Sequence, residues 1–349
     1  MRVEEVLAEK LGEAIKKYRG LRRPSVKDLF ARIAYLGPED FKIEGYKRSR
    51  PVVAFNPGAI VEGRKLLLFP RLIFDYFHYI SSVGVTELDL EELLNGSLET
   101  PLPTKVILWP KELWEFLGCE DPRVVRVNGS FYVLYTGRGY ALRGEGYEMR
   151  GVQGFAELDR SWRVKRRGYF SIRSGEELFV PRSHKDSAIL GFEGEKVGFL
   201  TRPEIRGLSV CWGGWADLRK LEIDGDSLKP VLVNEKWEWK VGWSTNALKL
   251  SKDEYLVGWH SVLRDDNSYR DGLALVSGEG ELMAISDYLL APKGVIEEYG
   301  DRPLVIFGDG LIRYKEYLLW IGGVGDYAIA ILGSELDKVL EELRTVRRC

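Results

Sequence analysis

The chain of 349 residues lacks a long hydrophobic run, is poor in cysteine and has no large excess of charge of either sign. No apolar run approaches the roughly 18 residues of a membrane-spanning helix, so we expect no membrane partner. A net charge of −2 argues against a protein built around a global field for nucleic acid. The three cysteines, Cys119, Cys211 and Cys349, show no metal-ligand spacing and cannot all pair with one another. We therefore expect a cytoplasmic protein that holds no metal.

Common nucleotide-binding signatures are also missing. No Walker A sequence occurs, and the doublet Gly137-Arg-Gly139 lacks a third glycine at the spacing of a dinucleotide-binding loop. Strand-like and helix-like segments do not alternate as they do in βαβ proteins. These absences argue against a Rossmann-type enzyme.

One pattern recurs along the chain. A turn of charged residues or glycine leads into a short strand rich in Tyr, Leu, Val and Phe. The five copies, aligned on equivalent residues, follow one another at intervals of 66, 65, 58 and 62 positions. The aligned residues are Leu66, Tyr132, Val197, Tyr255 and Tyr317. A period near sixty, with further strand candidates between the copies, is typical of a β-propeller. The sequence therefore predicts an all-β, five-bladed β-propeller.

Long helical patterns occur only at the two ends of the chain. Residues Met1–Arg19 alternate charged and apolar residues, as an amphipathic helix does and a signal peptide does not. The second pattern runs over 334–346, with Ser334 as its candidate N-cap. We therefore divide the chain into an N-terminal helical extension (1–50), the propeller (51–333) and a C-terminal helix (334–349). The terminal helices are candidates for mediating a homo-oligomer.

The segment Gly118–Val124 carries the most suggestive group of polar residues. Proline at position 122 pushes Asp121 toward an extended conformation. Asp121 and Arg123 are two residues apart, so in an extended chain their side chains share one side. A carboxyl group beside a guanidinium suits a site that transfers a proton and also holds an anion or a polar sugar. The same residues would also suit an ordinary surface ion pair at the entry of a strand.

In a propeller, residues about sixty positions apart meet near one axis, so polar residues beside each marked strand are site candidates. Five tryptophans lie within one short window, and tryptophan faces stack on sugar rings. Because most tryptophans belong to cores, we expect at most two of these five at a sugar subsite. They are Trp212, Trp215, Trp237, Trp239 and Trp243.

Gly118–Val124 resembles the corresponding motif of glycoside hydrolase family 130, the five-bladed inverting β-mannoside phosphorylases and their hydrolytic relatives. The resemblance continues in the same order from about Asn56 to Leu332. It is carried by Asn56–Ile60, Ser183–Asp186, Thr201–Pro203, Tyr255–His260, Ile306–Gly310 and Gly323–Asp326. Two segments depart from the family's pattern, Phe69–Tyr76 in the first repeat and Gly242–Ala247 in the fourth.

The resemblance implies roles for individual residues. Asp121 matches the family's catalytic acid, which is thought to act through a sugar hydroxyl. The family's phosphate-binding residues fall near Arg150, Arg166 and His260. The remaining matches, implied to bind sugar, are Asn56, Arg123, Lys185, Asp186 and Asp326. Inorganic phosphate would be a co-substrate, and no cofactor is implied.

Chemistry separates the possible reactions. Inverting cleavage needs an acid at the leaving oxygen and a nucleophile on the opposite face of the sugar. A hydrolase adds a second carboxylate to activate water, whereas a phosphorylase needs cations that hold phosphate in line. One clear acid with several basic candidates favours a phosphorylase that releases α-mannose 1-phosphate from β-mannosides. Two alternatives stay open. One is a hydrolase with Glu204, Asp266 or Asp309 as base, and the other is a non-catalytic carbohydrate-binding propeller.

Overall fold

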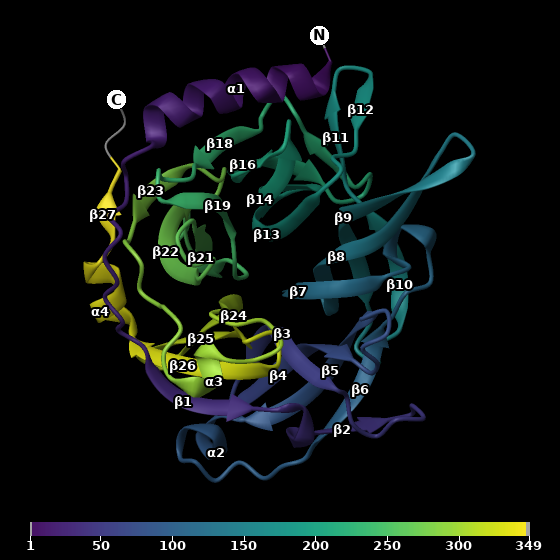
Figure 1. Ribbon diagram of the computed structural model, residues 1–349, viewed down its shortest axis with the longest axis vertical. Helices are drawn as coiled ribbons and strands as arrows, with labels where there is room; N and C mark the ends of the chain where they lie inside the picture. Colours follow the sequence, from purple (N-terminus) through teal and green to yellow (C-terminus); the bar gives the residue numbers. More distant parts are fainter. Residues whose placement is uncertain (1, 347–349) are drawn as a thin grey trace.

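Each copy of the sequence repeat forms a β-hairpin, and five such hairpins surround one axis in the computed structural model, which describes residues 2–346 (Figure 1). The marked strand is the second strand of its blade in every case, namely β4, β8, β14, β21 and β25. The predicted five-bladed propeller is therefore confirmed. The repeat was detectable because the second strands are buried on both faces and read as apolar runs.

Blades 1 and 2 share one sheet but are joined only by the pair Ser81–Gly118. Blade 1 consists of β3 (Val53–Glu62), β4 (Lys65–Ile73), β5 (Ser81–Asp89) and β6 (Leu102–Leu108), with α2 (Leu90–Leu94) after β5. Blade 2 consists of β7 (Gly118–Val127), β8 (Ser130–Arg143), β9 (Gly146–Leu158) and β10 (Val164–Tyr169), preceded by the 3₁₀ turn η2 (Leu113–Glu115).

Blades 3 and 4 carry extra short strands at their edges. Blade 3 contains β13 (His184–Glu193), β14 (Lys196–Ile205), β16 (Cys211–Asp217) and β17 (Glu222–Asp224), joined by β11 (Ser171–Ser174), β12 (Glu177–Phe179), β15 (Leu208–Ser209) and β18 (Lys229–Leu232). Blade 4 contains β19 (Glu238–Trp243), β20 (Leu248–Lys249), β21 (Glu254–Leu263), β22 (Tyr269–Ser277), β23 (Leu282–Ile285) and β27 (Arg344–Thr345).

The N-terminal part of the chain closes the ring. Blade 5 consists of β24 (Ile306–Tyr314), β25 (Tyr317–Val324), β26 (Ala328–Glu335) and, from the other end of the sequence, β1 (Ala31–Leu36), with α3 (Val295–Glu298) before β24. Strand β2 (Phe41–Glu44), which follows the 3₁₀ turn η1 (Pro38–Asp40), pairs with β6 of blade 1. The predicted boundary at residue 50 is thus misplaced, because 31–44 supplies strands to two blades.

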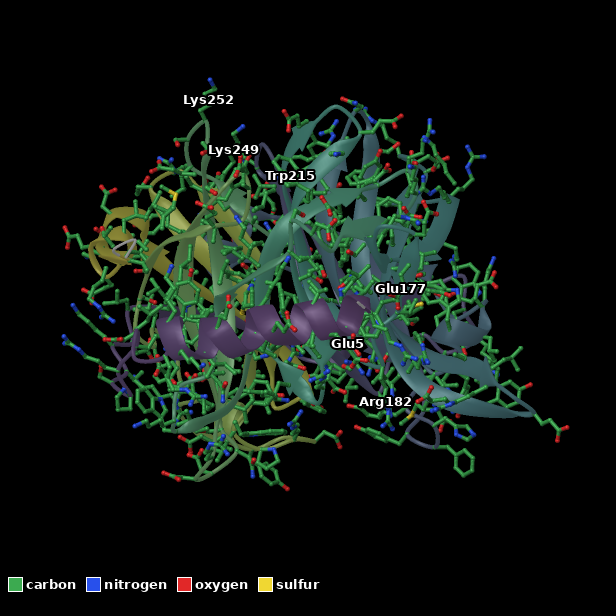
Figure 2. The ribbon with its side chains drawn as sticks, turned by 90° about the horizontal axis from the view of Figure 1, so that it is seen from above. Glu5, Glu177, Arg182, Trp215, Lys249 and Lys252 are labelled. Atoms are coloured by element: carbon green, nitrogen blue, oxygen red, sulfur yellow. The ribbon has the colours of Figure 1, made fainter. Side chains whose placement is uncertain are left out.

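The two terminal helices differ in how well the sequence predicts them. Helix α1 (Val3–Tyr18) matches the expected amphipathic segment and lies across the side of the molecule, with Glu177 near its beginning (Figure 2). Its apolar face packs on the core of blade 3. Helix α4 (Leu336–Glu341) is much shorter than predicted, and Ser334 belongs to β26 instead of capping the helix. Residues 347–349 of the predicted helix lie outside the described part of the chain.

The innermost strands share a local distortion that shapes the centre of the propeller. The ladders of blades 1, 2 and 3 are interrupted by bulges at Asn56, Asp121 and Asp186, which have φ values of 43°, 50° and 54°. Asn and Asp tolerate this left-handed conformation better than most residues. The extended conformation predicted for Asp121 from the following proline is therefore wrong. A bulge redirects its side chain, and these three turn toward the axis.

Candidate active site

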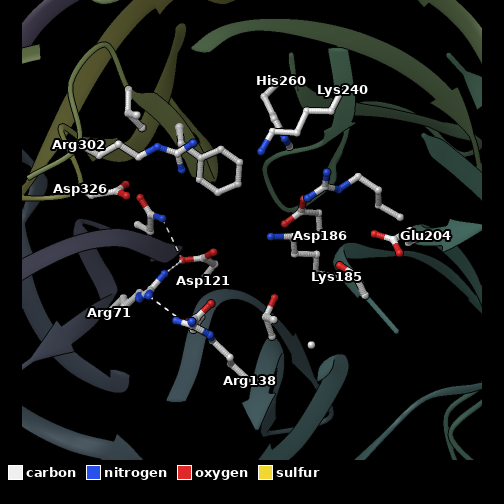
Figure 3. Close-up of a pocket in the computed structure, with 18 of the residues that line it drawn as sticks. Arg71, Asp121, Arg138, Lys185, Asp186, Glu204, Lys240, His260, Arg302 and Asp326 are labelled. Carbon is white, nitrogen blue, oxygen red and sulfur yellow. Dashed lines mark hydrogen bonds and ion pairs between the residues drawn. The ribbon is translucent and has the colours of Figure 1, made fainter. Parts of the chain in front are cut away.

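A cavity of about 540 Å³ lies where the bulged strands meet, and residues from all five blades line it (Figure 3). Its lining is dominated by charge, with eight Lys or Arg residues and five Asp or Glu residues. The residues that matter below are Asn56, Arg71, Glu120, Asp121, Arg138, Arg150, Lys185, Asp186, Arg202, Glu204, Lys240, His260, Tyr269, Arg302, Phe307 and Asp326.

One side of the cavity is built around the Asp121 carboxylate. Its Oδ1 accepts hydrogen bonds of 2.9 Å from Asn56 Nδ2 and from Arg71 Nη1. Arg71 also binds Glu120 Oε1 at 2.9 Å and donates to Ser81 Oγ at 2.8 Å. Burial would raise the pKa of Asp121, but Arg71, Arg123 and the Asn56 hydrogen bond together lower it. Asp121 is therefore an ionised acceptor held in one orientation.

The opposite side carries cations beside aromatic rings (Figure 3). Lys240 Nζ donates to the Tyr269 hydroxyl at 3.0 Å, and the Arg302 guanidinium lies 5.0 Å from the centre of the same ring. Burial, and then repulsion by Arg202, Lys185 and Arg302, lowers the pKa of Lys240 to about 7. Within residues 2–346 neither Lys240 nor Arg302 forms an ion pair. These cations are thus available to an anionic ligand.

His260 stands between this cationic side and the floor of the cavity. Its ring is fully buried, and Nδ1 lies 3.1 Å from the carbonyl oxygen of Trp243. Because a carbonyl oxygen only accepts, Nδ1 carries the hydrogen and Nε2 presents its lone pair. Burial and the charge of Arg202 lower the pKa of His260. The neutral ring can therefore accept a hydrogen bond from a protonated oxygen of an anion.

Gly242 makes the close packing of two of these side chains possible. A Cβ atom at this position would lie 2.5 Å from Arg202 Cδ and 2.6 Å from His260 Cε1. Strand β19 therefore needs a glycine where it passes between the two side chains. The departure of Gly242–Ala247 from the family's pattern thus falls directly on this wall of the cavity.

The comparisons with known proteins agree with this geometry. Residues 20–345 match the profile of the glycoside hydrolase 130 family, described as beta-1,4-mannooligosaccharide phosphorylase. The chain belongs to glycoside hydrolase family 130. It is 25% identical over 305 residues to a beta-1,2-mannobiose phosphorylase of Thermoanaerobacter sp. (strain X514), covering 82% of this chain and 91% of that protein.

Solved structures of other phosphorylases share the fold. The beta-1,2-mannobiose phosphorylase of Listeria innocua, in complex with beta-1,2-mannobiose, gives a TM-score of 0.67 at 16% identity and covers 88% of this chain and 96% of its own. A mannose phosphorylase of Leishmania mexicana, in complex with phosphate ion, gives 0.57 at 13% identity and covers 99% and 97%. At these levels of identity the structural similarity is evidence for a shared fold alone.

Most of the residues implied by the family resemblance lie in the cavity. Asn56, Asp121, Lys185, Asp186 and Asp326 all line it, as do Arg150 and His260. Burial raises the pKa of Asp326 to about 6, against the opposing effect of Arg71 and Arg302. Arg150 is less free than expected, because Glu148 holds its guanidinium at 2.9 Å.

Two of the residues implied by the family resemblance lie outside the lining of the cavity, and their positions argue against the predicted roles. Arg166 points away from the cavity, with its guanidinium bonded to the carbonyl oxygen of Leu218 and 5.3 Å from the centre of the Phe155 ring. It cannot contact phosphate from there. Arg123 lies beneath the cavity, 3% exposed, with its donors bound to protein groups. It is not placed to bind a sugar.

Sequence reasoning missed several cavity residues, and for three of them (Arg71, Arg138 and Arg202) the repeat carried the same signal as for His260. Arg71, Arg138, Arg202 and His260 follow the aligned residue of their repeat by five or six positions and lie on the second strands of blades 1 to 4. Only the histidine was singled out. Lys240, Tyr269 and Arg302 come from other strands and loops, where the repeat offers no marker. The five clustered tryptophans do not line the cavity, and its aromatic surface comes from Tyr79, Tyr269 and Phe307.

In residues 2–346 no group of three or more His, Cys, Asp or Glu side chains is arranged to hold a metal ion. Nor is any helix there long and apolar enough to cross a membrane. Cys119 and Cys211 are buried and unpaired, and Cys349 lies outside the described residues.

Proposed function

We propose that this family 130 protein is an inverting phosphorylase that transfers a mannosyl group from a β-mannoside to inorganic phosphate. The products would be α-mannose 1-phosphate and the released sugar. The observation that carries the proposal is the wall of Lys240, Arg302 and His260, which faces Asp121 across the cavity and in which neither Lys240 nor Arg302 forms an ion pair within residues 2–346. A neutral disaccharide alone has no need of two unpaired cations, whereas a phosphate dianion does.

The two sides of the cavity would have different roles in the reaction. Phosphate held by Lys240 and Arg302 would attack the anomeric carbon, and the bond to the leaving oxygen would break. Overall, the proton of monohydrogen phosphate ends on that oxygen. Asp121, with Oδ2 free of hydrogen bonds in the described structure, would deliver the proton through a sugar hydroxyl, as the family resemblance implies. A bound dianion would raise the low pKa of Asp121 toward the range in which it can carry a proton.

A β-mannoside hydrolase is the second candidate, because Glu204 lines the same cavity. One structural relative is described with the words that the family of mannoside phosphorylases contains glycoside hydrolases that target beta-1,2 mannosidic linkages in Candida mannan. The other two carboxylates considered as bases are poorly placed. Asp266 is absent from the lining, and Asp309 is fully buried against Arg123. Glu204 is therefore the residue on which a hydrolytic reading would depend.

The test is cleavage of β-1,2- and β-1,4-mannobiose with and without phosphate, followed by ³¹P NMR and by detection of free mannose. The proposal expects α-mannose 1-phosphate and negligible cleavage without phosphate. Equal release of mannose in phosphate-free buffer, abolished by Glu204→Gln, would establish the hydrolase instead. Sugar binding without turnover on both disaccharides and longer oligosaccharides would support the non-catalytic alternative.

A further inference from the structure

Arg123 ties four blades together directly beneath the cavity. On its own strand in blade 2, Nη1 donates to the carbonyl oxygen of Asp121 at 2.7 Å. Toward blade 4, Nε donates to the carbonyl oxygen of Ser244 at 2.6 Å. Nη2 lies 2.9 Å from Asp309 Oδ1 of blade 5 and 3.4 Å from Asp186 Oδ1 of blade 3. The rigid fork of a guanidinium allows this set of contacts, and an ammonium group cannot reproduce it.

The contact with Asp121 bears on catalysis because of the backbone there. Asp121 sits at a bulge with a φ of 50°, and the carbonyl oxygen bound by Arg123 belongs to this left-handed residue. The direction of the Asp121 side chain depends on that conformation being maintained. Arg123 therefore fixes the carboxylate from below, while Asn56 and Arg71 fix it from the side.

The contact with Asp186 leads to the cationic side. Asp186 Oδ2 lies 2.6 Å from Arg202 Nη2, so this carboxylate is shared between the two arginines. Arg202 and His260 both lie next to Gly242. A path of contacts thus runs from Asp121 through Arg123 and Asp186 to Arg202, which lies beside His260 next to Gly242. Each member is at least nine-tenths buried, which keeps solvent from weakening the electrostatic links.

We propose that Arg123 is a positioning residue that couples anion binding on the cationic side to the placement of Asp121. The inference rests on the proposed phosphorylase function. An anion that draws Arg202 toward the cavity weakens the ion pair between Arg202 and Asp186. The Asp186 carboxylate then interacts more strongly with Arg123. Arg123 in turn holds the backbone carbonyl of Asp121 more firmly in place. Because coupling is reciprocal, a sugar that binds Asp121 strengthens phosphate binding by the same factor.

The test is calorimetry of phosphate binding with and without saturating mannose, in the wild type, Arg123→Lys and Arg126→Gln. Arg126 is a matched control, since it lies on the same strand but pairs with Glu62 at the exposed end of the hairpin. We expect mannose to lower the Kd for phosphate by about 5- to 150-fold in the wild type and in Arg126→Gln. In Arg123→Lys this factor should approach one, and kcat should fall more than KM for phosphate rises.

The outcomes separate the inference from simpler explanations. Unchanged coupling in a folded Arg123→Lys protein would overturn it, and so would wild-type protein that binds phosphate without any effect of mannose. Loss of both binding events with a lowered Tm would show that Arg123 only supports the fold. If Arg123→Lys does not fold, Asp309→Ala takes its place, because it removes the carboxyl oxygen that lies 2.9 Å from Nη2 of the guanidinium and should reduce the same coupling. Wild-type protein that binds no phosphate would count against the proposed function itself.

Discussion

The two sides of the cavity differ in how their charges are balanced. On the side of blades 1 and 2, Arg71 binds both Asp121 and Glu120 through hydrogen bonds of 2.9 Å, and Arg138 lies 3.8 Å from Glu120, so this side is complete without a ligand. On the side of blades 3 to 5, Lys240 and Arg302 are held by the Tyr269 ring and its hydroxyl, and their charges have no carboxylate partner among the described residues. The first side is pre-organised for a neutral sugar, and the second is prepared for an anion.

The pKa of Asp121 and the pKa of Lys240 are both lowered in this cavity, but for different reasons. Arg71 and Arg123 lower the pKa of Asp121 despite its burial, because opposite charges lie close by. Burial and three neighbouring cations lower the pKa of Lys240, because like charges disfavour its ammonium form. A phosphate bound at the second side would relieve that repulsion. Relief of this repulsion would therefore contribute to the proposed affinity for phosphate.

The largest expected effect on activity comes from Asp121, on the side of blades 1 and 2. Asp121→Asn preserves the shape of the side chain and its place beside Asn56 but removes the proton carrier. We expect kcat for β-mannobiose phosphorolysis to fall by about 10²- to 10⁴-fold, the usual contribution of general acid catalysis. Phosphate binding measured by calorimetry should persist, and Tm should change little. Near-normal turnover in a folded variant would show that another group protonates the leaving oxygen.

A change at Gly242 should damage the anion side alone. In Gly242→Ala the new Cβ would press on Arg202 and His260, and overpacking of this kind costs about 1–3 kcal/mol. We expect KM for phosphate to rise by about 5- to 150-fold, since 1.4 kcal/mol corresponds to a factor of ten. Gly12→Ala is a suitable control, because a Cβ atom there would meet nothing within 4 Å. Unaltered KM in Gly242→Ala would mean that the two side chains do not contact phosphate.

The charge of Lys240 should give phosphate binding a distinctive pH dependence. With its pKa near 7, Lys240 is charged below that pH and loses its charge above it. We expect the KM for phosphate of the wild type, divided by that of Lys240→Arg, to increase as pH rises from 6 to 8. The titration of phosphate itself cancels in this ratio because both enzymes experience it. A ratio independent of pH would remove Lys240 from the list of phosphate ligands.

The smallest expected effect is a change in stability with pH, and it comes from Asp326. The folded-state pKa of Asp326 is about 6, above the unfolded value near 3.9, so the native state binds more protons between these pH values. Stability therefore falls as pH rises through this window, since the buried carboxylate must ionise. We expect Asp326→Asn to raise Tm at pH 7.5 and to give no gain at pH 4. The same difference in Tm at both pH values would show that ionisation of Asp326 does not affect stability.

The sequence predicts the two sides unequally, for physical reasons. Asn56, Asp121 and Asp186 sit at equivalent bulges 65 residues apart, so the periodicity of the chain and the family motifs both lead to them. Arg71 and Arg202 occupy equivalent positions on the second strands and could have been found from the repeat. Lys240 and Arg302 could not, because their positions depend on how β19 and the loop before β24 enter the cavity. Arg166 was misplaced because the run of basic residues Lys165–Arg167 gives no indication of whether its side chains reach the cavity, and none of them lines it.

The ends of the chain show a different limit of prediction. Helix α1 was readable because its buried residues Val3, Leu7, Leu11 and Ala14 follow helical spacing. Strand β1 was not, because a six-residue strand with mixed polarity becomes recognisable only through its pairing with β26, about three hundred positions away. Ring closure therefore depends on a contact that local sequence patterns do not report.

The most direct test of the account is a phosphate titration by calorimetry with three proteins: the wild type, the double variant Lys240→Met/Arg302→Gln, and Arg166→Gln. The account predicts one phosphate bound per chain in the wild type and in Arg166→Gln, with similar Kd, and loss of binding in the double variant. Retained binding in the double variant, or its loss in Arg166→Gln, would contradict the assignment of phosphate to the cations of blades 4 and 5.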